Sequence, residues 1–108
     1  MTIAHVAVHA NDGSAQVTVR GEIDLANAAD VEREIFAALT NKLSAVSVDL
    51  TGLTFIDSAG LRVLFGLAQR LQLLQISLEL RVSPDSLVRR VIELSGLAAL
   101  VPLRPEVS

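Results

Sequence analysis

The chain has 108 residues, of which 51% are hydrophobic, and a formal charge of −3. This is the size of one domain, 1–108, with enough apolar surface to form a core. Because the chain has no cysteine, it contains no disulfide, thiolate metal site or thiol nucleophile. Its apolar runs are too short to span a membrane and its start lacks the basic residues of a signal peptide, so we expect a cytoplasmic protein without membrane insertion. Without a Lys/Arg run, and with Phe as its only aromatic residue type, it is not expected to bind nucleic acid directly.

Two segments with alternating apolar residues, Ile3 to Ala10 and Ala15 to Gly21, flank a turn cluster that contains Asp-Gly. This pattern predicts an opening β-hairpin. His5 and His9 fall on one face of the first strand. Because no third ligand accompanies them, they indicate surface or edge packing and no metal site.

A helix is predicted from Ala26 to Leu39, because its apolar residues share one face: Val31, Ile35, Ala38 and Leu39. Acidic residues cluster near its start, where negative charge stabilises the helix dipole. The β-branched segment from Ala45 to Leu50 then predicts a strand.

A long amphipathic helix is predicted from Ser58 to Leu74, after a short polar link that contains glycine. Asp57 or Ser58 can cap this helix, because the side-chain oxygen of either can accept a hydrogen bond from the first-turn N–H groups. A hydroxyl at the positive end of the helix dipole is a favourable place for a phosphate.

The core face of this helix is predicted from the spacing of five residues: Leu61, Leu64, Phe65, Ala68 and Leu71. A second apolar line, Val63, Leu67 and Leu74, points away from the first. Docking of a partner and burial within the protein both explain this second line.

The remaining segments predict a strand from Gln75 to Val82 and a helix that Ser83 caps. Gly96 is placed to end this helix, and its buried face is expected to comprise Leu87, Val88, Val91 and Leu94. A last short strand is expected within Leu97 to Leu103. The order of elements predicts a single α/β domain, with helices packed against a mixed sheet of four to five strands.

The segment Thr54-Phe55-Ile56-Asp57-Ser58-Ala59-Gly60-Leu61 resembles the signature of the STAS domain of bacterial anti-sigma factor antagonists. Gly-Glu-Ile-Asp at 21–24 resembles a second STAS signature, and Ser-Pro at 83–84 and Ser-Gly-Leu at 95–97 match in register. The resemblance therefore covers nearly the whole chain through residue 97.

In the family, the serine that matches Ser58 is phosphorylated, and the acid that matches Asp24 lies near the partner-binding surface. The resemblance and the helix pattern together give an expected partner-binding set without cofactor or metal: Asp24, Asp57, Ser58, Gly60, Val63 and Leu67.

The resemblance implies a partner switch. The unphosphorylated protein, a monomer or weak dimer, would bind an ATP-binding anti-sigma factor serine kinase and so release a sigma factor for transcription. Phosphorylation of Ser58 would end the binding, because the phosphate adds negative charge beside Asp57 and Asp24. A PP2C-type phosphatase would reset the switch.

Two other functions compete with this switch. An enzyme with Ser58 as nucleophile is not expected, because Ile56 stands where a nucleophile elbow needs glycine and no phosphate-binding glycine loop occurs. The alternative within the fold is a stand-alone STAS subunit of a lipid or anion transport complex, or of a stress-signalling scaffold. Such a subunit would hold its partners whether or not Ser58 carries charge.

Overall fold

The computed structural model describes residues 2–40 and 42–105. The chain opens with a β-hairpin, β1 (Ala4–Asn11) and β2 (Ser14–Ile23), as the sequence predicts. Its two-residue turn is closed by pairing of Asn11 with Ser14. Gly13 in this turn has a φ of +77°, a conformation that side chains with a Cβ rarely adopt.

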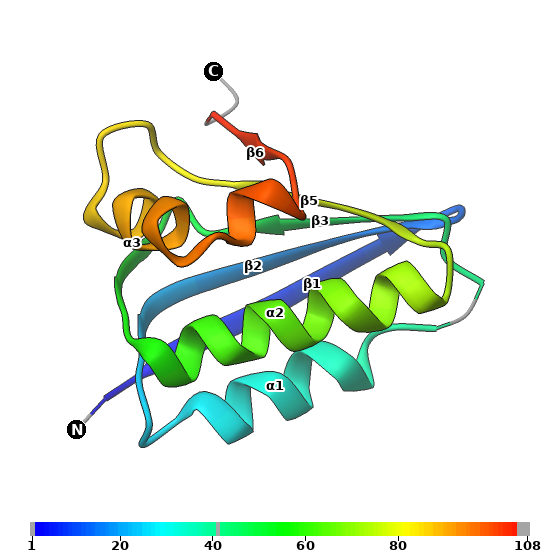
Figure 1. The fold of residues 1–108 in the computed structure, drawn as a ribbon. Coiled ribbons are helices and arrows are strands. Elements are labelled where there is room, and N and C mark those ends of the chain that lie inside the picture. The colour runs from blue at the N-terminus through cyan, green and yellow to red at the C-terminus, as the bar shows by residue number, and fades with distance from the viewer. Residues whose placement is uncertain (1, 41, 106–108) are drawn as a thin grey trace.

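Three helices and four further strands follow the hairpin (Figure 1). The helices are α1 (Ala28–Ala37), α2 (Ser58–Leu73) and α3 (Leu87–Ser95). The strands are β3 (Ala45–Asp49), β4 (Leu53–Ile56), β5 (Ser77–Arg81) and β6 (Leu103–Arg104), and a 3-10 turn, Leu97–Ala99, precedes β6. None of the described helices is both long and apolar enough to cross a membrane.

The strands form one mixed six-stranded sheet in the order β1-β2-β3-β5-β6, with β4 beside β2. Of the strand pairs in the described part of the chain, β1–β2 is antiparallel and the others are parallel. β3 pairs with the first half of β2, whereas β4 pairs with its end, where Ile23 lies opposite Ile56. The carboxyl ends of β2 and β4 therefore meet at one place, directly before α1 and α2.

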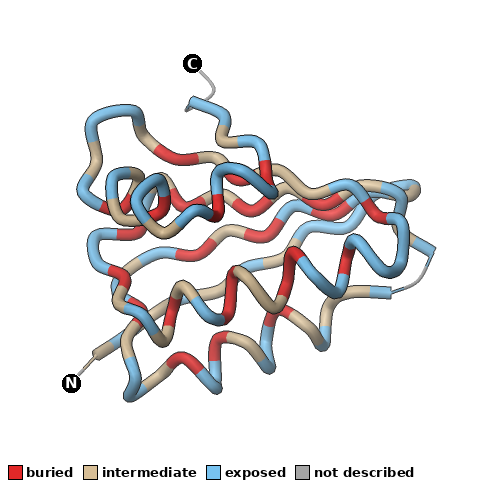
Figure 2. The backbone as a smooth tube through the Cα atoms, viewed as in Figure 1, coloured by how far each residue is buried: buried red, intermediate tan, exposed pale blue. Residues whose placement is uncertain are grey.

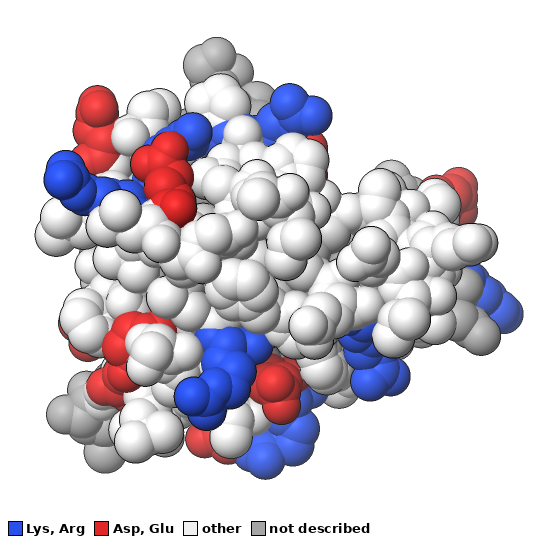
Figure 3. All heavy atoms as spheres, viewed as in Figure 1, with Lys and Arg blue, Asp and Glu red and all other residues white. Residues whose placement is uncertain are grey.

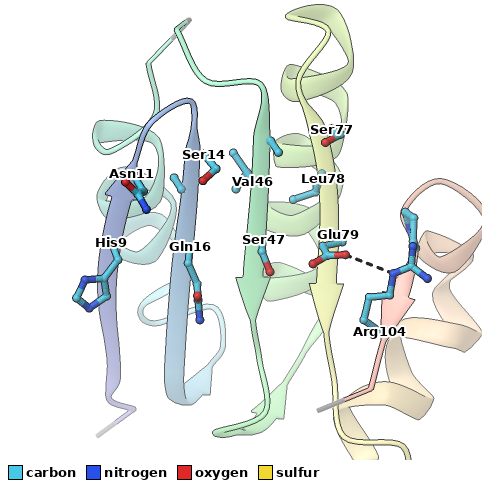
Figure 4. A pocket seen from close by; sticks show the side chains of 13 residues that line it. His9, Asn11, Ser14, Gln16, Val46, Ser47, Ser77, Leu78, Glu79 and Arg104 are labelled. Atoms are coloured by element: carbon cyan, nitrogen blue, oxygen red, sulfur yellow. Dashed lines mark hydrogen bonds and ion pairs between the residues drawn. The ribbon is translucent and has the colours of Figure 1, made fainter. Parts of the chain in front are cut away.

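The core lies between the sheet and its helices (Figure 2). Val17, Val48 and Leu80 lie side by side on β2, β3 and β5 and are almost completely buried. Their neighbours Gln16, Ser47 and Glu79 point to the opposite face, which the helices leave open (Figure 4). This alternation is typical of a sheet with one covered face.

β4 was not predicted as a strand, and the sheet has one strand more than the largest number expected. Leu53–Ile56 is short, and both middle residues, Thr54 and Phe55, are exposed. A four-residue segment of this kind carries almost no periodicity. Its pairing with the end of β2 is a tertiary contact, which local pattern does not encode.

Of the second apolar line of α2, Val63 and Leu67 are buried in the core, at 4% and 0% exposed, whereas Leu74, directly after the helix, is 44% exposed. The expected core residues Leu61 and Phe65 lie on the flank and are only partly buried. The buried face of α2 is therefore turned from the predicted one, and Gly60 explains why. A Cβ at Gly60 would lie 2.5 Å from Ile56 Cγ1, so only glycine lets the face that contains Gly60 approach the sheet.

The prediction for α3 was wrong in its start and partly wrong in its buried face. Ser86, and not Ser83, is the N-cap, and its hydroxyl accepts a hydrogen bond from Arg89 N–H at 3.0 Å. Val88 is buried as expected, together with Ile92, whereas the side chains of Leu87 and Leu94 are exposed. Gly96 ends the helix as predicted, with a φ of +89°. The segment expected to be a strand after it contains the 3-10 turn.

Candidate functional site

Asp57 is the N-cap of α2 and links it to the loop that precedes α1. Its Oδ1 accepts hydrogen bonds from the N–H groups of Ala59 at 2.9 Å and Gly60 at 3.1 Å. Its Oδ2 accepts from Leu25 N–H at 3.1 Å. One carboxylate therefore satisfies two first-turn donors and fixes the neighbouring loop.

Ser58 is the first residue of α2, and its side chain is exposed. Because Asp57 supplies the cap, the Ser58 hydroxyl is not used for this purpose. Within residues 2–40 and 42–105 the hydroxyl of Ser58 makes no hydrogen bond. The structure thus decides between the two candidate caps, and it leaves the serine oxygen accessible to a reagent or enzyme.

Asp24 lies across from Asp57, because β2 and β4 end side by side. Its Oδ2 accepts a hydrogen bond from the Thr2 hydroxyl at 2.5 Å, and its Oδ1 accepts from Ala26 N–H at 2.8 Å. The Thr2 hydrogen bond, opposed by partial desolvation and supported by backbone N–H donors, lowers the pKa of Asp24 from its ordinary value. Asp24 is therefore a charged, well-fixed element of the site.

The loop before α1 is shaped by one side chain that the sequence interpretation missed, Asn27. Asn27 accepts a hydrogen bond from Asp24 N–H at 3.0 Å and donates one to the Glu22 carbonyl at 2.9 Å. The Asp24 side chain bonds within the same loop, to Ala26 N–H, so side-chain to backbone hydrogen bonds from both Asp24 and Asn27 hold the loop. The Asp and Asn residues three positions apart, at 24 and 27, were the sequence signal for this turn.

Leu25, at the tip of this loop, is 81% exposed although it is apolar. It borders a hollow of about 230 Å³ between the first turns of α1 and α2, whose other lining residues are Ala28, Ala29, Glu32, Ala59, Arg62 and Val63. A leucine in a polar loop was visible in the sequence and is a signal of a surface contact residue. Charged side chains of both signs lie over this end of the two helices (Figure 3).

Four of the six expected partner-binding residues lie at this end of the molecule, and they differ in how far they are exposed. Asp24, Asp57 and Ser58 reach the surface, whereas Gly60 is buried beneath them. The expectation that Leu67 offers a docking face is wrong, because Leu67 is 0% exposed in the monomer, whereas Val63, at 4% exposed, lines the hollow. Leu25 and Arg62 are exposed and line the same hollow.

Residues 5–108 match the family model described as the STAS domain. The chain belongs to the STAS domain family. BtrV of Bordetella bronchiseptica is 36% identical over 93 residues, which cover 85% of this chain and 78% of BtrV. The anti-sigma-F factor antagonist RsfB of Mycobacterium tuberculosis is 32% identical over 93 residues, 85% of this chain and 74% of RsfB.

The crystal structure of an anti-sigma factor antagonist from Mycobacterium paratuberculosis is similar to this STAS domain throughout. It has a TM-score of 0.85 at 30% identity and covers 97% of this chain and 88% of the other. The α/β fold and the family predicted from the signatures are therefore confirmed. RsfB and the protein of this crystal structure are both anti-sigma factor antagonists, the type of STAS protein that the signatures resemble.

Proposed function

We propose that this protein is a cytoplasmic anti-sigma factor antagonist, which binds an anti-sigma factor serine kinase while Ser58 is unmodified and loses that binding when Ser58 is phosphorylated. The observation that carries the proposal is the exposed Ser58 hydroxyl, left free by the Asp57 cap at the start of α2. A kinase can reach this oxygen without unfolding the helix.

The docking surface in this proposal comprises Asp24, Leu25, Ser58 and Arg62. Leu25 offers the apolar contact, and the hollow beside it can receive a side chain of the kinase. Leu25 N–H is held by Asp57, so the loop is already ordered before binding. A preformed surface loses little conformational entropy on association, which favours affinity.

Phosphorylation would act through local charge. A phosphate carries about −1.5 to −2 charges, and the adjacent N–H groups of Ala59 and Gly60 are already occupied by Asp57. The phosphate therefore gains few backbone donors and adds its charge beside two carboxylates. Binding of an apolar partner surface over this group would require its desolvation, which is unfavourable.

Arg62 gives the phosphate a partner on the same helix. It follows Ser58 by four residues, the spacing at which side chains meet on a helix surface, and it is exposed. No ion pair of Arg62 occurs among the residues that the structure describes. A phosphate on Ser58 would pair with this guanidinium and so remove a free cation that the kinase would otherwise contact, and a PP2C-type phosphatase would restore it.

The proposal is tested with Ser58→Ala and Ser58→Asp baits in host lysate, with retained proteins identified by mass spectrometry. Ser14→Asp is the matched control, since Ser14 is exposed at the opposite end of β2. We expect an ATP-binding serine kinase of the anti-sigma type on the Ala and control baits and not on Ser58→Asp. Retention of the same transport or scaffold proteins on all three baits would instead favour a stand-alone transport or scaffold subunit.

A further inference from the structure

Among the residues that the structure describes, β1 is an outer strand of the sheet and is hydrogen-bonded to one strand, β2. Its eight residues, Ala-His-Val-Ala-Val-His-Ala-Asn, contain no Pro, Lys, Arg, Asp or Glu. Protein sheets usually protect an exposed edge with such residues, because an edge with free N–H and C=O groups can pair with another strand. β1 itself contains none of these protective residues.

The hairpin determines which backbone groups of β1 are free. Asn11 pairs with Ser14 across the two-residue turn, and the Ile3 carbonyl accepts from Glu22 N–H at 3.0 Å. Hydrogen-bonded positions alternate along an antiparallel strand, so the odd-numbered residues of β1 bond to β2. The even-numbered ones direct their N–H and C=O groups to the free edge: Ala4, Val6, Val8 and Ala10.

We propose that the free edge of β1 pairs antiparallel with β1 of a second copy of this chain, with the two-fold axis at Ala7. Only even-numbered residues can exchange hydrogen bonds across this edge, so each even-numbered residue must lie opposite another even-numbered residue. The two-fold axis must therefore lie at a residue and not between two residues. At Ala7 it pairs residues 4–10 of both copies and places each Val6 opposite a Val8. The result is one continuous sheet that spans both protomers.

The incomplete burial of Val6 and Val8 in the monomer supports pairing with a second copy of the chain. Val17 and Val19 of β2 are 0% exposed, whereas their β1 neighbours Val8 and Val6 are only partly buried on the same face. The Val6–Val8 contacts across the axis would cover this remaining apolar surface. The interface is self-complementary, as a two-fold dimer requires.

The open face of β1 presents no charged side chain to a second copy. Figure 4 shows His9 and Asn11 on this outermost strand, and His5 and Ala7 lie on the same face. In the proposed register each His5 lies opposite a His9, and the two Ala7 residues face each other at the axis. Ala7 is small and exposed, and it occupies a closely approaching pair without hydrogen bonds.

A charge at the axis tests both the dimer and its register. Ala7→Lys and Ala7→Glu each place like charges directly opposite in the dimer but on an exposed edge in the monomer. By light scattering over a micromolar to millimolar series, we expect a dimer for the unmodified protein and monomers for each variant. A mixture of the two variants should dimerise again. An unmodified protein that stays monomeric throughout would overturn the proposal.

A cysteine at the axis gives an independent readout, because the chain has none of its own. Cα atoms of a non-hydrogen-bonded pair lie about 4.5 Å apart, within the range of about 4.4–6.8 Å that a disulfide spans. We expect Ala7→Cys to form a covalent dimer on mild oxidation. Thr18→Cys, opposite Ala7 on β2 but one strand inward, is the matched control. Equal cross-linking of the two variants would contradict the register.

Discussion

Asp57 and Asp24 are two acidic residues at the same end of the sheet with different structural tasks. Asp57 joins α2 to the loop before α1 through three backbone hydrogen bonds. Asp24 orders that loop internally and takes up the Thr2 hydroxyl. Because Asp57 supplies the cap of α2, Ser58 at the start of this helix keeps an exposed hydroxyl in a fixed position.

Asp57→Ala is expected to lower the free energy of unfolding by about 1–2 kcal/mol, since it removes the N-cap of α2. Urea denaturation measures this loss. Ser58→Ala is the matched control and should change stability by less than about 0.5 kcal/mol, because the Ser58 side chain is exposed and not the cap. Equal losses in the two variants would mean that Ser58 shares the capping.

The lowered pKa of Asp24 predicts a pH dependence of stability. A carboxylate whose pKa is lower in the folded state stabilises the protein above its unfolded pKa, and this contribution is lost as the pH falls through the folded pKa. Asp24→Asn should therefore be less stable than the unmodified protein at about pH 7, and the difference should shrink towards about pH 3. Denaturant titrations at several pH values measure it, and a constant difference would refute this linkage.

At the scale of elements, α2 lies with Gly60, Leu67 and Leu71 against the sheet. A Cβ at Gly60 would come within 2.5 Å of Ile56 and 3.0 Å of Ile23, the two residues that pair at the ends of β4 and β2. The glycine of the signature thus has a packing role, which sets how closely the Ser58 end of the helix approaches the sheet.

Gly60→Ala is expected to destabilise the protein by about 1–3 kcal/mol, because the added methyl overpacks the contact with Ile56. Gly66→Ala is the matched control on the same helix, since a Cβ there meets no atom within 4 Å. That variant should gain about 0.5–1 kcal/mol from helix propensity. Thermal unfolding of both variants gives the comparison, and a neutral Gly60→Ala would exclude the packing role.

Leu67 and Leu25 are expected to separate stability from partner binding. Leu67→Ala should cost about 2–5 kcal/mol of stability, because this side chain is 0% exposed. Leu25→Ala should change stability by less than about 0.5 kcal/mol, because its side chain is 81% exposed, and should weaken binding to the kinase. Calorimetry measures both effects. Unchanged kinase binding of Leu25→Ala would remove Leu25 from the docking surface.

The sequence predicted most elements because their patterns are local. The Asp-Gly hairpin, the alternation in β5 and the position of Gly96 all appear where expected. The orientation of α2 and the buried face of α3 were partly wrong, since both helices carry more apolar residues than one face holds. Contacts with β4 and the close approach at Gly60 determine which apolar face is buried. These contacts depend on the whole fold and are not encoded in a local pattern.

Prediction of the site followed the same division. The signature pointed to Ser58, which lies at the exposed start of α2, and Asp57, one of two candidate caps, is the N-cap. Thr2 and Asn27 were missed, because their bonds to Asp24 depend on how the chain end and loop fold back. Val63 and Leu67 were assigned to the surface because an apolar line on a helix does not reveal which elements cover it.

At the scale of the whole molecule, the proposed switch and the proposed dimer use different surfaces. Ser58 lies where β2 and β4 end, whereas β1 forms the outer edge of the sheet. In the proposed switch, phosphorylation changes the charge of the Ser58 surface and leaves the core beneath it packed. Partner exchange would therefore proceed without unfolding or rearrangement of the sheet.

The most direct test of the switch is the affinity of the recovered kinase for the unmodified and the Ser58-phosphorylated protein, measured by calorimetry. We expect phosphorylation to raise the Kd at least about tenfold, equivalent to about 1.4 kcal/mol. Ser14→Asp should bind like the unmodified protein. Equal affinity of the phosphorylated and unmodified proteins would contradict the assignment of Ser58 as the switch.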